Sequence, residues 1–461
     1  MHARFVVIGG GLSGLAAAIR LARFNDNVLL LEKHSRLGGL NSYYYRDSRL
    51  LETGLHAITN YAAPGIRQAP FNRLLRQLKL SRQDIGSHEQ VGSEIRFPGC
   101  RLRFSNDFSE LLESVENTFG SAVDDFSRFV SVLDGVDPFL PTPFQSTRSI
   151  MAEHLREPLL REMLLCPMCY YGSSIEDDVD FNQFVILFRA IFQEGLFRPR
   201  GSIKQLLDLL VDHFHRFGGK IKSKSGVSAI HTSGDRVVEL ELDDGQNLTC
   251  DQVISTIGHA ETLQLLGAIE KPTETRRLGF LESIFVVDEH GAALLPDDIT
   301  CLFYNDSDRF RFRRPADPVD FSSGVVSLPK NFRHLDNTTQ EGEIRSTHLA
   351  NYERWRACAD QQDAYRALKK WSAATSQQRV AKMVGDFAEH IVFQDSFTPV
   401  TIERFTGKKE GAIYGSPIKA TDGRIGYANL FLAGTDQGYL GIVGSMLSGV
   451  TVVNRHLLMK S

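Results

Sequence analysis

The chain has 461 residues, 42% of them hydrophobic, and a formal net charge of −4 at pH 7. This length supports about two or three domains with a substantial core. The slight acidity, with a sequence pI of about 6.4, excludes the broad basic surface of a nucleic-acid-binding protein. Because no run of about 18 uncharged apolar residues occurs, no membrane-spanning segment is predicted.

The start of the chain and its cysteines bear on the cellular compartment. The first strand is expected to begin at residue 4 or 5, which leaves no room for a signal or transit peptide. Six scattered cysteines are typical of reduced thiols, so we expect a cytoplasmic protein. Cys166 and Cys169 have redox spacing but lie in an apolar run. Buried structural cysteines are therefore favoured over a working dithiol.

The N-terminal run FVVIGGGLSG predicts a strand, a glycine turn and a helix. Gly9 permits the turn, Gly11 lets the backbone approach a pyrophosphate, and Gly14 lets the helix pack closely on the strand. The helix opens at Leu12 and Ser13, where free N–H groups and the helix dipole favour phosphate. A dinucleotide site is predicted in preference to a chance glycine turn.

An acidic residue follows the second predicted strand, 28–31. Glu32 lies where a carboxylate would accept hydrogen bonds from ribose hydroxyls. The next residues extend the fingerprint as flavoproteins do, with a second close backbone approach and a basic side chain near the pyrophosphate; they are Lys33, Arg36, Gly38, Gly39 and Leu40. The alternative is a surface turn with a solvated arginine.

The middle of the chain changes character twice. Residues 70–195 are expected to be mostly helical, with apolar spacing near 3.6 at 108–119 and 151–165. Phenylalanines cluster at 181–192, where they line a pocket for a large apolar ligand or form ordinary core.

After residue 198 the pattern predicts a helix at 203–217, a strand meander and a returning strand at 252–258. Strands at 283–287, 300–304 and 324–328 suit the floor of a substrate cavity, and 345–388 is expected to be helical.

The C-terminal region has the pattern of the second half of a flavin site. A buried strand ends at Gly434 and Asp436, whose carboxylate can bond a ribitol hydroxyl. A glycine-rich helix then opens at Gly441, Ile442 and Val443, where its N-terminus can stabilise negative charge on the pyrimidine edge of a reduced flavin.

Taken together, the chain resembles the phytoene desaturase-like flavoproteins, which include carotenoid desaturases, carotenoid isomerases and retinol saturases. The resemblance runs nearly end to end and includes residues 36–39, 54–56, 199–201, 253–255, 397–399, 411–415, 434 and 436. It implies non-covalent FAD and a long apolar polyene drawn from a membrane. It also implies that the Gly54 turn lies beside the flavin and that the Val227 backbone contacts the adenine.

Two departures from the carotenoid desaturase pattern bear on the substrate. Thr256-Ile257-Gly258 replaces the usual Asn-Ala-Asp, and Gln437-Gly438 stands where a Pro-Gly turn is usual. We therefore keep a carrier-bound acyl chain beside a carotenoid-like molecule as the expected substrate. Peripheral membrane contact is expected from the substrate class and the aromatic stretch at 181–197.

Removal of hydrogen from a C–H bond requires a nearby flavin and a site for the departing proton. His56 is the best-placed candidate, although it could instead bond backbone or flavin without proton transfer. Tyr414 is the second catalytic candidate, with aromatic packing as its alternative. Tyr170 and Tyr171 are expected to be packing residues, and no metal site is predicted.

The expected fold is α/β: a Rossmann-type two-dinucleotide-binding-domain flavoprotein with an inserted α+β substrate domain. Residues 1–70, 198–264 and 395–461 form the FAD-binding domain, and 71–197 and 265–394 the substrate domain. One alternative is an amine oxidase-like enzyme, for which Lys408 and Lys409 are lysine candidates that look solvated. The other is a non-catalytic prenyl-protein escort-type binding protein. The oligomeric state is left open.

Overall fold

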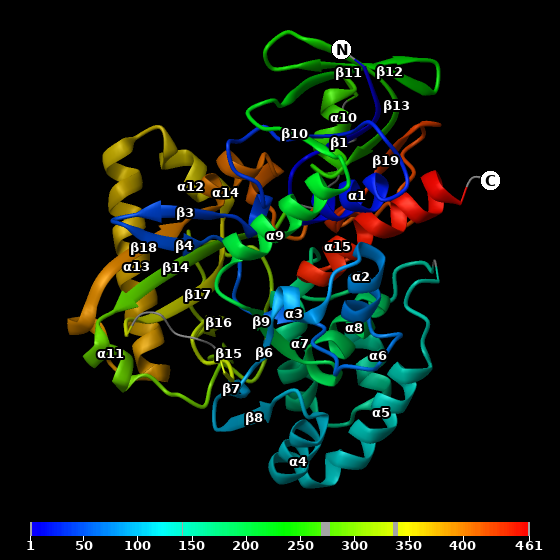
Figure 1. Ribbon diagram of the computed structural model, residues 1–461. Coiled ribbons are helices and arrows are strands. Elements are labelled where there is room, and N and C mark those ends of the chain that lie inside the picture. The colour runs from blue at the N-terminus through cyan, green and yellow to red at the C-terminus, as the bar shows by residue number, and fades with distance from the viewer. Residues whose placement is uncertain (1, 141, 269–276, 335–339, 460–461) are drawn as a thin grey trace.

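The computed structural model describes residues 2–140, 142–268, 277–334 and 340–459. Figure 1 shows a sheet near both termini, a second sheet beside it, and a cluster of helices below the first sheet. The two chain ends thus lie on the same part of the molecule, as a cofactor site built from both ends requires.

The first sheet has seven strands. Its parallel part runs β10-β2-β1-β13-β19, and an antiparallel pair, β12 and β11, extends it beyond β13. Its strands are β1 (His2–Ile8), β2 (Val28–Leu31), β10 (Lys220–Lys222), β11 (Val227–Ser233), β12 (Arg236–Leu242), β13 (Asn247–Ser255) and β19 (Leu430–Leu432). The apolar runs of the central strands are explained by burial on both faces.

Helices from both ends of the chain and from its middle pack beside this sheet. They are α1 (Leu12–Ala22), α2 (Pro70–Leu78), α3 (Arg82–Ile85), α9 (Ile203–Arg216), α10 (His259–Leu265) and α15 (Gly441–Val453). A Cβ atom at Gly449 would lie 2.2 Å from the Ser13 carbonyl oxygen, so a glycine in α15 allows it to approach α1. The N-terminal and C-terminal helices are therefore packed backbone to backbone.

The second sheet also has seven strands, in the order β18-β14-β17-β16-β15-β7-β8. They are β7 (Ser93–Phe97), β8 (Cys100–Phe104), β14 (Gly279–Val287), β15 (Cys301–Asn305), β16 (Ser323–Ser327), β17 (Gly342–Ala350) and β18 (Ile391–Phe397). Its inner face, which carries Phe280, Phe303 and Leu349, packs against the helix cluster. Its outer face carries Phe285 and Ile344 and packs against the long helix α13.

The remaining helices surround the second sheet. The inner cluster is α4 (Phe108–Phe119), α5 (Val123–Gly135), α6 (Thr147–His154), α7 (Pro158–Gly172) and α8 (Phe181–Phe188). The others are α11 (Glu289–Leu294), α12 (Tyr352–Ala359), α13 (Gln362–Val384) and α14 (Pro399–Thr406). Short strands complete the fold: β3 (Tyr43–Arg46), β4 (Arg49–Glu52), β5 (Ile58–Thr59), β6 (Ser87–Glu89) and β9 (Leu196–Pro199).

Two expectations about the elements were wrong. Residues 342–350 form β17 rather than the start of a helix, because alternating side chains face the two sides of a buried sheet. Residues 70–195 are mostly helical as expected, and they also contain the β7–β8 hairpin. A single helix over 151–165 is in fact α6 and α7, divided before Pro158, which occupies the first helical position of α7.

The aromatic stretch at 181–192 lies in the core. Phe181, Phe184, Phe188 and Phe192 are at most 5% exposed and belong to the inner cluster. The expectation that this stretch contacts a membrane was therefore wrong. Burial also raises the pKa of both Cys166 and Cys169 well above the usual thiol value, which disfavours thiolate chemistry.

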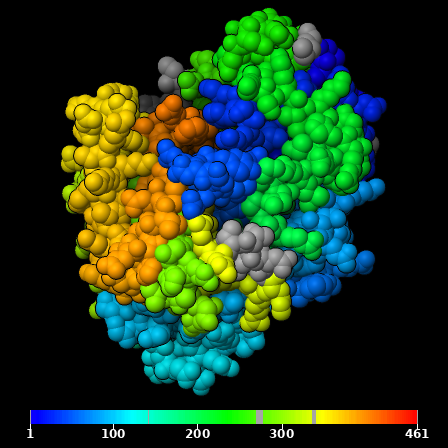
Figure 2. Space-filling view, turned by 60° about the vertical axis from the view of Figure 1, so that its left-hand side comes forward, coloured from blue at the N-terminus to red at the C-terminus, as the bar shows by residue number. Residues whose placement is uncertain are grey.

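At the surface, the β3–β4 hairpin contacts both β18 of the second sheet and α9, which packs beside the first sheet. In Figure 2 the blue surface near residues 40–50 lies between the orange of β18 and α14 and the green of α9. Tyr44 donates to Asp395 of β18 at 3.1 Å, and Lys204 of α9 lies 5.8 Å from the Tyr43 ring centre. The expected domain boundary at residue 395 falls inside β18, whose last residues still pair with β14.

Candidate functional site

The two glycine-rich segments of the N-terminal region are in direct contact. Gly38 N–H donates to the Gly10 carbonyl at 2.9 Å, and Gly11 and Gly38 form an isolated parallel bridge. Gly38 and Gly39 have φ values of 112° and 58°, the left-handed region that glycine favours. The two segments therefore lie side by side at the start of α1.

Gly14 and Gly11 of the N-terminal turn differ in whether the protein itself requires glycine there. A Cβ atom at Gly14 would lie 1.9 Å from the Gly9 carbonyl oxygen, so the turn excludes any side chain there. At Gly11 the nearest atom, the Gly38 carbonyl oxygen, would be 4.0 Å away, and the backbone φ of −70° suits any residue. The protein itself therefore does not need glycine at position 11, and the close approach of a pyrophosphate there stays a prediction.

The polar groups around this turn fit a dinucleotide. No described side chain caps α1, so its first N–H groups remain available to phosphate. The buried hydroxyls of Ser13 and Ser225 have no hydrogen-bond partner among the described residues. Glu32 accepts from Gly10 N–H at 2.7 Å and from His34 N–H at 2.8 Å, which fixes its carboxylate beside the turn.

The other residues predicted to bind the cofactor surround the same turn or remain at its edge. Val227 begins β11, and the adjacent Ser225 N–H donates to the Glu32 carbonyl at 2.9 Å. A Cβ at Gly54 would meet the Leu40 carbonyl at 2.6 Å, so these two segments touch. Lys33 and Arg36 are exposed. Their contacts with the cofactor stay predictions.

The Gly434 turn and α15 of the C-terminal region lie beside α1. Gly434 has a φ of 106°, and its N–H donates to Ser448 Oγ at 2.6 Å. No described side chain caps α15, which opens at Gly441, where a Cβ would lie 3.0 Å from Thr59 Oγ1. Ile442 and Val443 are buried in the core cluster that also contains α1.

Asp436 lies at the centre of a buried charged group. It is 1% exposed and accepts from His259 N–H and Ser416 N–H, each at 2.7 Å. Burial by itself raises the pKa of Asp436, but the Lys408 and Lys419 charges and these backbone donors together hold it below the usual value. The predicted bond to ribitol would add a partner to a carboxylate that is already fixed.

One of the two lysines expected to be solvated differs from that expectation. Lys408 is buried at 8% exposure, so the interpretation of a solvated lysine was wrong, whereas Lys409 is exposed. Burial lowers the pKa of Lys419 to about 8, and its ammonium donates to the Tyr414 carbonyl at 2.8 Å. Both Lys408 and Lys419 thus lie close enough to Asp436 for their charges to stabilise its ionised form.

His56 lies on the inner face of the second sheet. Its Nδ1 is 2.6 Å from Ser327 Oγ, and its Nε2 is 3.1 Å from Glu282 Oε1. The His56 side chain is 19% exposed and that of Glu282 is 8% exposed. The catalytic candidate therefore has a hydrogen-bond partner at Nδ1 and a carboxylate in close contact with Nε2.

Aromatic residues lie near the Glu282 carboxylate. The Tyr414 ring lies 5.9 Å from that of Phe280, and its hydroxyl donates to the Tyr170 carbonyl. Burial raises the pKa of Tyr414, and the Glu282 charge raises it further. Burial, with smaller contributions from Cys301, Tyr414 and Glu282, raises the pKa of Tyr171. Tyr414 and Tyr171 are therefore neutral at ordinary pH, and the catalytic role of Tyr414 stays a prediction.

Sequence reasoning missed Glu282, Ser327 and Arg345. Each stands in a strand whose neighbours are apolar or small, and a charged residue in such a strand is the signal that could have identified Glu282. Arg345 is fully buried in β17, which was expected to be helical. Only the strand pairing places these side chains near His56.

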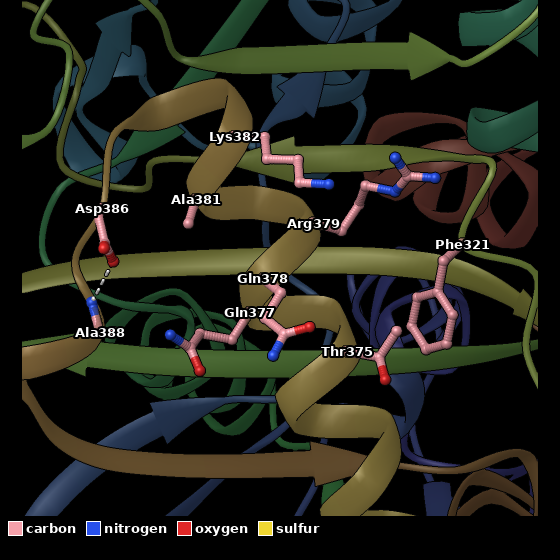
Figure 3. A pocket seen from close by; sticks show the side chains of 9 residues that line it. All are labelled: Phe321, Thr375, Gln377, Gln378, Arg379, Ala381, Lys382, Asp386 and Ala388. Carbon is pink, nitrogen blue, oxygen red and sulfur yellow. Dashed lines mark hydrogen bonds between the residues drawn. The ribbon is translucent and has the colours of Figure 1, made fainter.

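A depression on the outer side of the second sheet is unrelated to this site. Figure 3 shows it along the C-terminal half of α13; its lining residues are Phe321, Thr375, Gln377, Gln378, Arg379, Ala381, Lys382, Asp386 and Ala388. α13 packs on the outer face, opposite to His56 and Glu282. Within the described ranges, no cluster of metal-ligating side chains is found and no helix is long and apolar enough to cross a membrane.

Comparisons with known proteins agree with this geometry. A 4,4'-diaponeurosporene oxygenase from Staphylococcus haemolyticus is 23% identical over 454 residues, covering 89% of this chain and 87% of its own length. An oxidoreductase structure from Methanosarcina mazei has a TM-score of 0.67 at 17% identity, covering 99% and 100% of the two chains. Wild-type putrescine oxidase bound to putrescine has a TM-score of 0.62 at 14% identity, covering 98% of each chain.

These matches confirm the expected flavoprotein fold, and with it an FAD-dependent oxidoreductase. The resemblance to carotenoid-pathway flavoproteins is confirmed by the staphylococcal relative, at modest identity. The profile of the flavin containing amine oxidoreductases matches residues 12–455, from the first turn of α1 to the end of the last helix. The chain belongs to the flavin containing amine oxidoreductase family.

Proposed function

We propose that the enzyme acts on the C–C double bonds of a long apolar polyene, either a carotenoid-like molecule or a carrier-bound acyl chain. Desaturation is the leading reaction, with isomerisation or saturation as variants. The observation that carries the proposal is the match, over most of both chains, to a carotenoid oxygenase. The aromatic rings of Phe280, Tyr171 and Tyr414, two of which lie within reach of the Glu282 charge, support an apolar substrate.

In this proposal each part of the chain has a separate role. The Gly11 turn and the α1 N-terminus bind the pyrophosphate, Glu32 the ribose, and Asp436 the ribitol. The α15 N-terminus would stabilise negative charge on the pyrimidine edge of a reduced flavin. When bound, FAD supplies the two-electron acceptor for a hydride. His56 is the candidate residue that accepts the proton released from the substrate.

A visible spectrum followed by anaerobic titration tests the proposal. We expect a flavin spectrum that bleaches when a carotenoid or a polyunsaturated acyl thioester is added. If no candidate bleaches the oxidised flavin, the chemically reduced enzyme is assayed for isomerisation and saturation of the same polyenes. If neither form changes any polyene, the proposal is wrong.

Amine oxidation is the second candidate function. The Glu282 carboxylate lies among aromatic rings, an arrangement that suits a cation. Arg345 lies 3.7 Å from Glu282 Oε1 and compensates that charge, which is why we rank this function second. Bleaching by putrescine or another amine, and not by any polyene, would reverse the ranking. The escort-type alternative is set aside because the chain belongs to an oxidoreductase family.

We also propose peripheral contact with a membrane, through a surface other than the one predicted. The loop between α5 and α6 exposes Phe139, Leu140 and Phe144 at 55%, 60% and 55%. Exposed apolar side chains in one loop support insertion at a lipid interface. Replacing all three by serine is expected to weaken sedimentation with phosphatidylcholine–phosphatidylglycerol vesicles at least about tenfold. Equal sedimentation of variant and wild type would remove this proposal.

A further inference from the structure

The inner face of the second sheet brings together three polar residues from separate parts of the chain. Glu282 of β14 stands opposite Thr347 of β17, and Ser327 of β16 stands opposite Arg345 of β17. His56, in the turn after β4, contacts Glu282 of β14 and Ser327 of β16. Strand register therefore sets the spacing of the carboxylate and the hydroxyl on either side of one imidazole.

The two contacts of His56 assign its hydrogen atoms. Glu282 Oε1 lies 3.1 Å from His56 Nε2, as a close charge contact rather than an aligned hydrogen bond. A carboxylate at this distance repels a ring lone pair, so it favours the ring proton on Nε2. A neutral ring then has its lone pair on Nδ1, where Ser327 Oγ–H donates over 2.6 Å. This is the order of hydroxyl, imidazole and carboxylate by which proteins activate a histidine base.

A hydroxyl and a guanidinium hold the Glu282 carboxylate in place. Thr347 Oγ1–H donates to Glu282 Oε2 at 2.6 Å, and Arg345 lies 3.7 Å from Oε1. Arg345 also contacts Glu343 at 2.6 Å and donates to the Glu52 carbonyl at 2.6 Å.

Arg198 approaches His56 from β9. It pairs with Glu52 and donates to the carbonyls of Leu55 and His56, at 3.2 and 3.1 Å. Lys330, which donates to the Glu341 carbonyl, adds a further positive charge beside Glu343. The turn that carries His56 is thus anchored independently of its side chain.

We propose that Ser327, His56 and Glu282 form a proton relay, in which His56 Nδ1 takes the proton and Glu282 is the positioning residue. The inference rests on the proposed function. Converting a CH–CH unit to C=C breaks two C–H bonds, and one hydrogen leaves with two electrons as the hydride that FAD accepts. The other leaves as a proton to Ser327 Oγ, whose own proton passes to His56 Nδ1. The electrons of that second C–H bond form the new π bond.

Kinetics of anaerobic flavin bleaching by the polyene test the relay. S327A and E282Q are expected to slow bleaching about 100-fold with unchanged flavin content, the usual scale of general-base loss. E282D, which keeps the charge, is expected to recover most of the rate. The matched control is S346A, since Ser346 is a neighbouring buried serine whose hydroxyl bonds Ser376 on the outer face. We expect its rate within about twofold of wild type, since no relay contact is removed.

The pH profile separates this role from a merely structural one. The wild-type rate is expected to rise with pH as the base loses its proton. In E282Q the rising limb is expected to move to lower pH, because removal of the carboxylate disfavours the imidazolium. Wild-type rates in E282Q, or a limb that does not move, would overturn the relay.

A second measurement needs no substrate. In holoenzyme with ¹⁵N-labelled histidine, H56Q assigns the His56 ring nitrogens. The relay requires the proton of the neutral ring on Nε2; a proton on Nδ1 would refute it. If no polyene bleaches the flavin and the proton is on Nε2, the proposed substrate fails while the relay geometry stands.

Discussion

Replacing Asp436 with alanine is expected to destabilise the folded protein by about 3–5 kcal/mol, the usual result of removing one partner from a buried charge group. The carboxylate is 1% exposed and accepts two backbone N–H groups at 2.7 Å. Its removal leaves those donors without their acceptor and leaves the Lys408 and Lys419 charges without compensation. Urea unfolding of the apoprotein and holoprotein measures the loss.

The exposed Asp422 provides the control for this substitution. It lies on the same segment, and D422A is expected to change stability by less than about 0.5 kcal/mol. A D436A protein as stable as D422A would show that the Asp436 carboxylate contributes nothing to the fold.

The same carboxylate predicts a pH dependence. The pKa of Asp436 is lower in the folded protein than the value of about 4 expected in the unfolded chain. Its contribution is therefore fully present above about pH 4 and is lost as the pH falls through the folded value. The stability difference between wild type and D436N should be constant from pH 5 to 7 and should shrink below about pH 4.

Replacing Gly11 with alanine is expected to weaken FAD binding at least about 100-fold without destabilising the apoprotein. The new Cβ meets nothing in the protein closer than 4.0 Å, and the backbone φ of −70° accepts alanine. The methyl group instead occupies the space in which a pyrophosphate would approach the backbone. Fluorescence titration of the apoprotein with FAD and thermal unfolding without FAD measure the two effects separately.

Gly14 gives the opposite pattern and serves as the comparison. Its Cβ would lie 1.9 Å from the Gly9 carbonyl oxygen, so G14A should lower the stability of the apoprotein itself by about 1–3 kcal/mol. If G11A bound FAD normally, the glycine turn would not be the pyrophosphate site.

The cofactor site was predictable because its signals are local. The glycine spacing from Gly9 to Gly14 and the acid at Glu32 lie within one strand–helix–strand unit, and the structure forms that unit as expected. Gly434 and Asp436 follow a short apolar strand in the same way. The roles of the individual residues toward FAD stay predictions that the Gly11 and Asp436 variants test.

Other features depended on context that a single sequence does not contain. The phenylalanine stretch at 181–192 suits both a pocket wall and a core, and only the packing of α8 against α7 and the second sheet identifies it as core. β17 looked helical because its polar residues are frequent, yet Arg345 and His348 are fully buried and paired within a sheet. Lys408 looked solvated because it follows a glycine turn.

The sequence by itself determined the glycine-rich turn, the order of strands and helices around it, and the meeting of the two chain ends, where α15 packs on α1. These follow from short-range backbone sterics and from hydrophobic periodicity. Only the tertiary structure decided the partners of His56, since 271 positions separate it from Ser327 along the chain. Contacts across such a separation are set by the register of buried strands, which depends on the packing of the whole sheet.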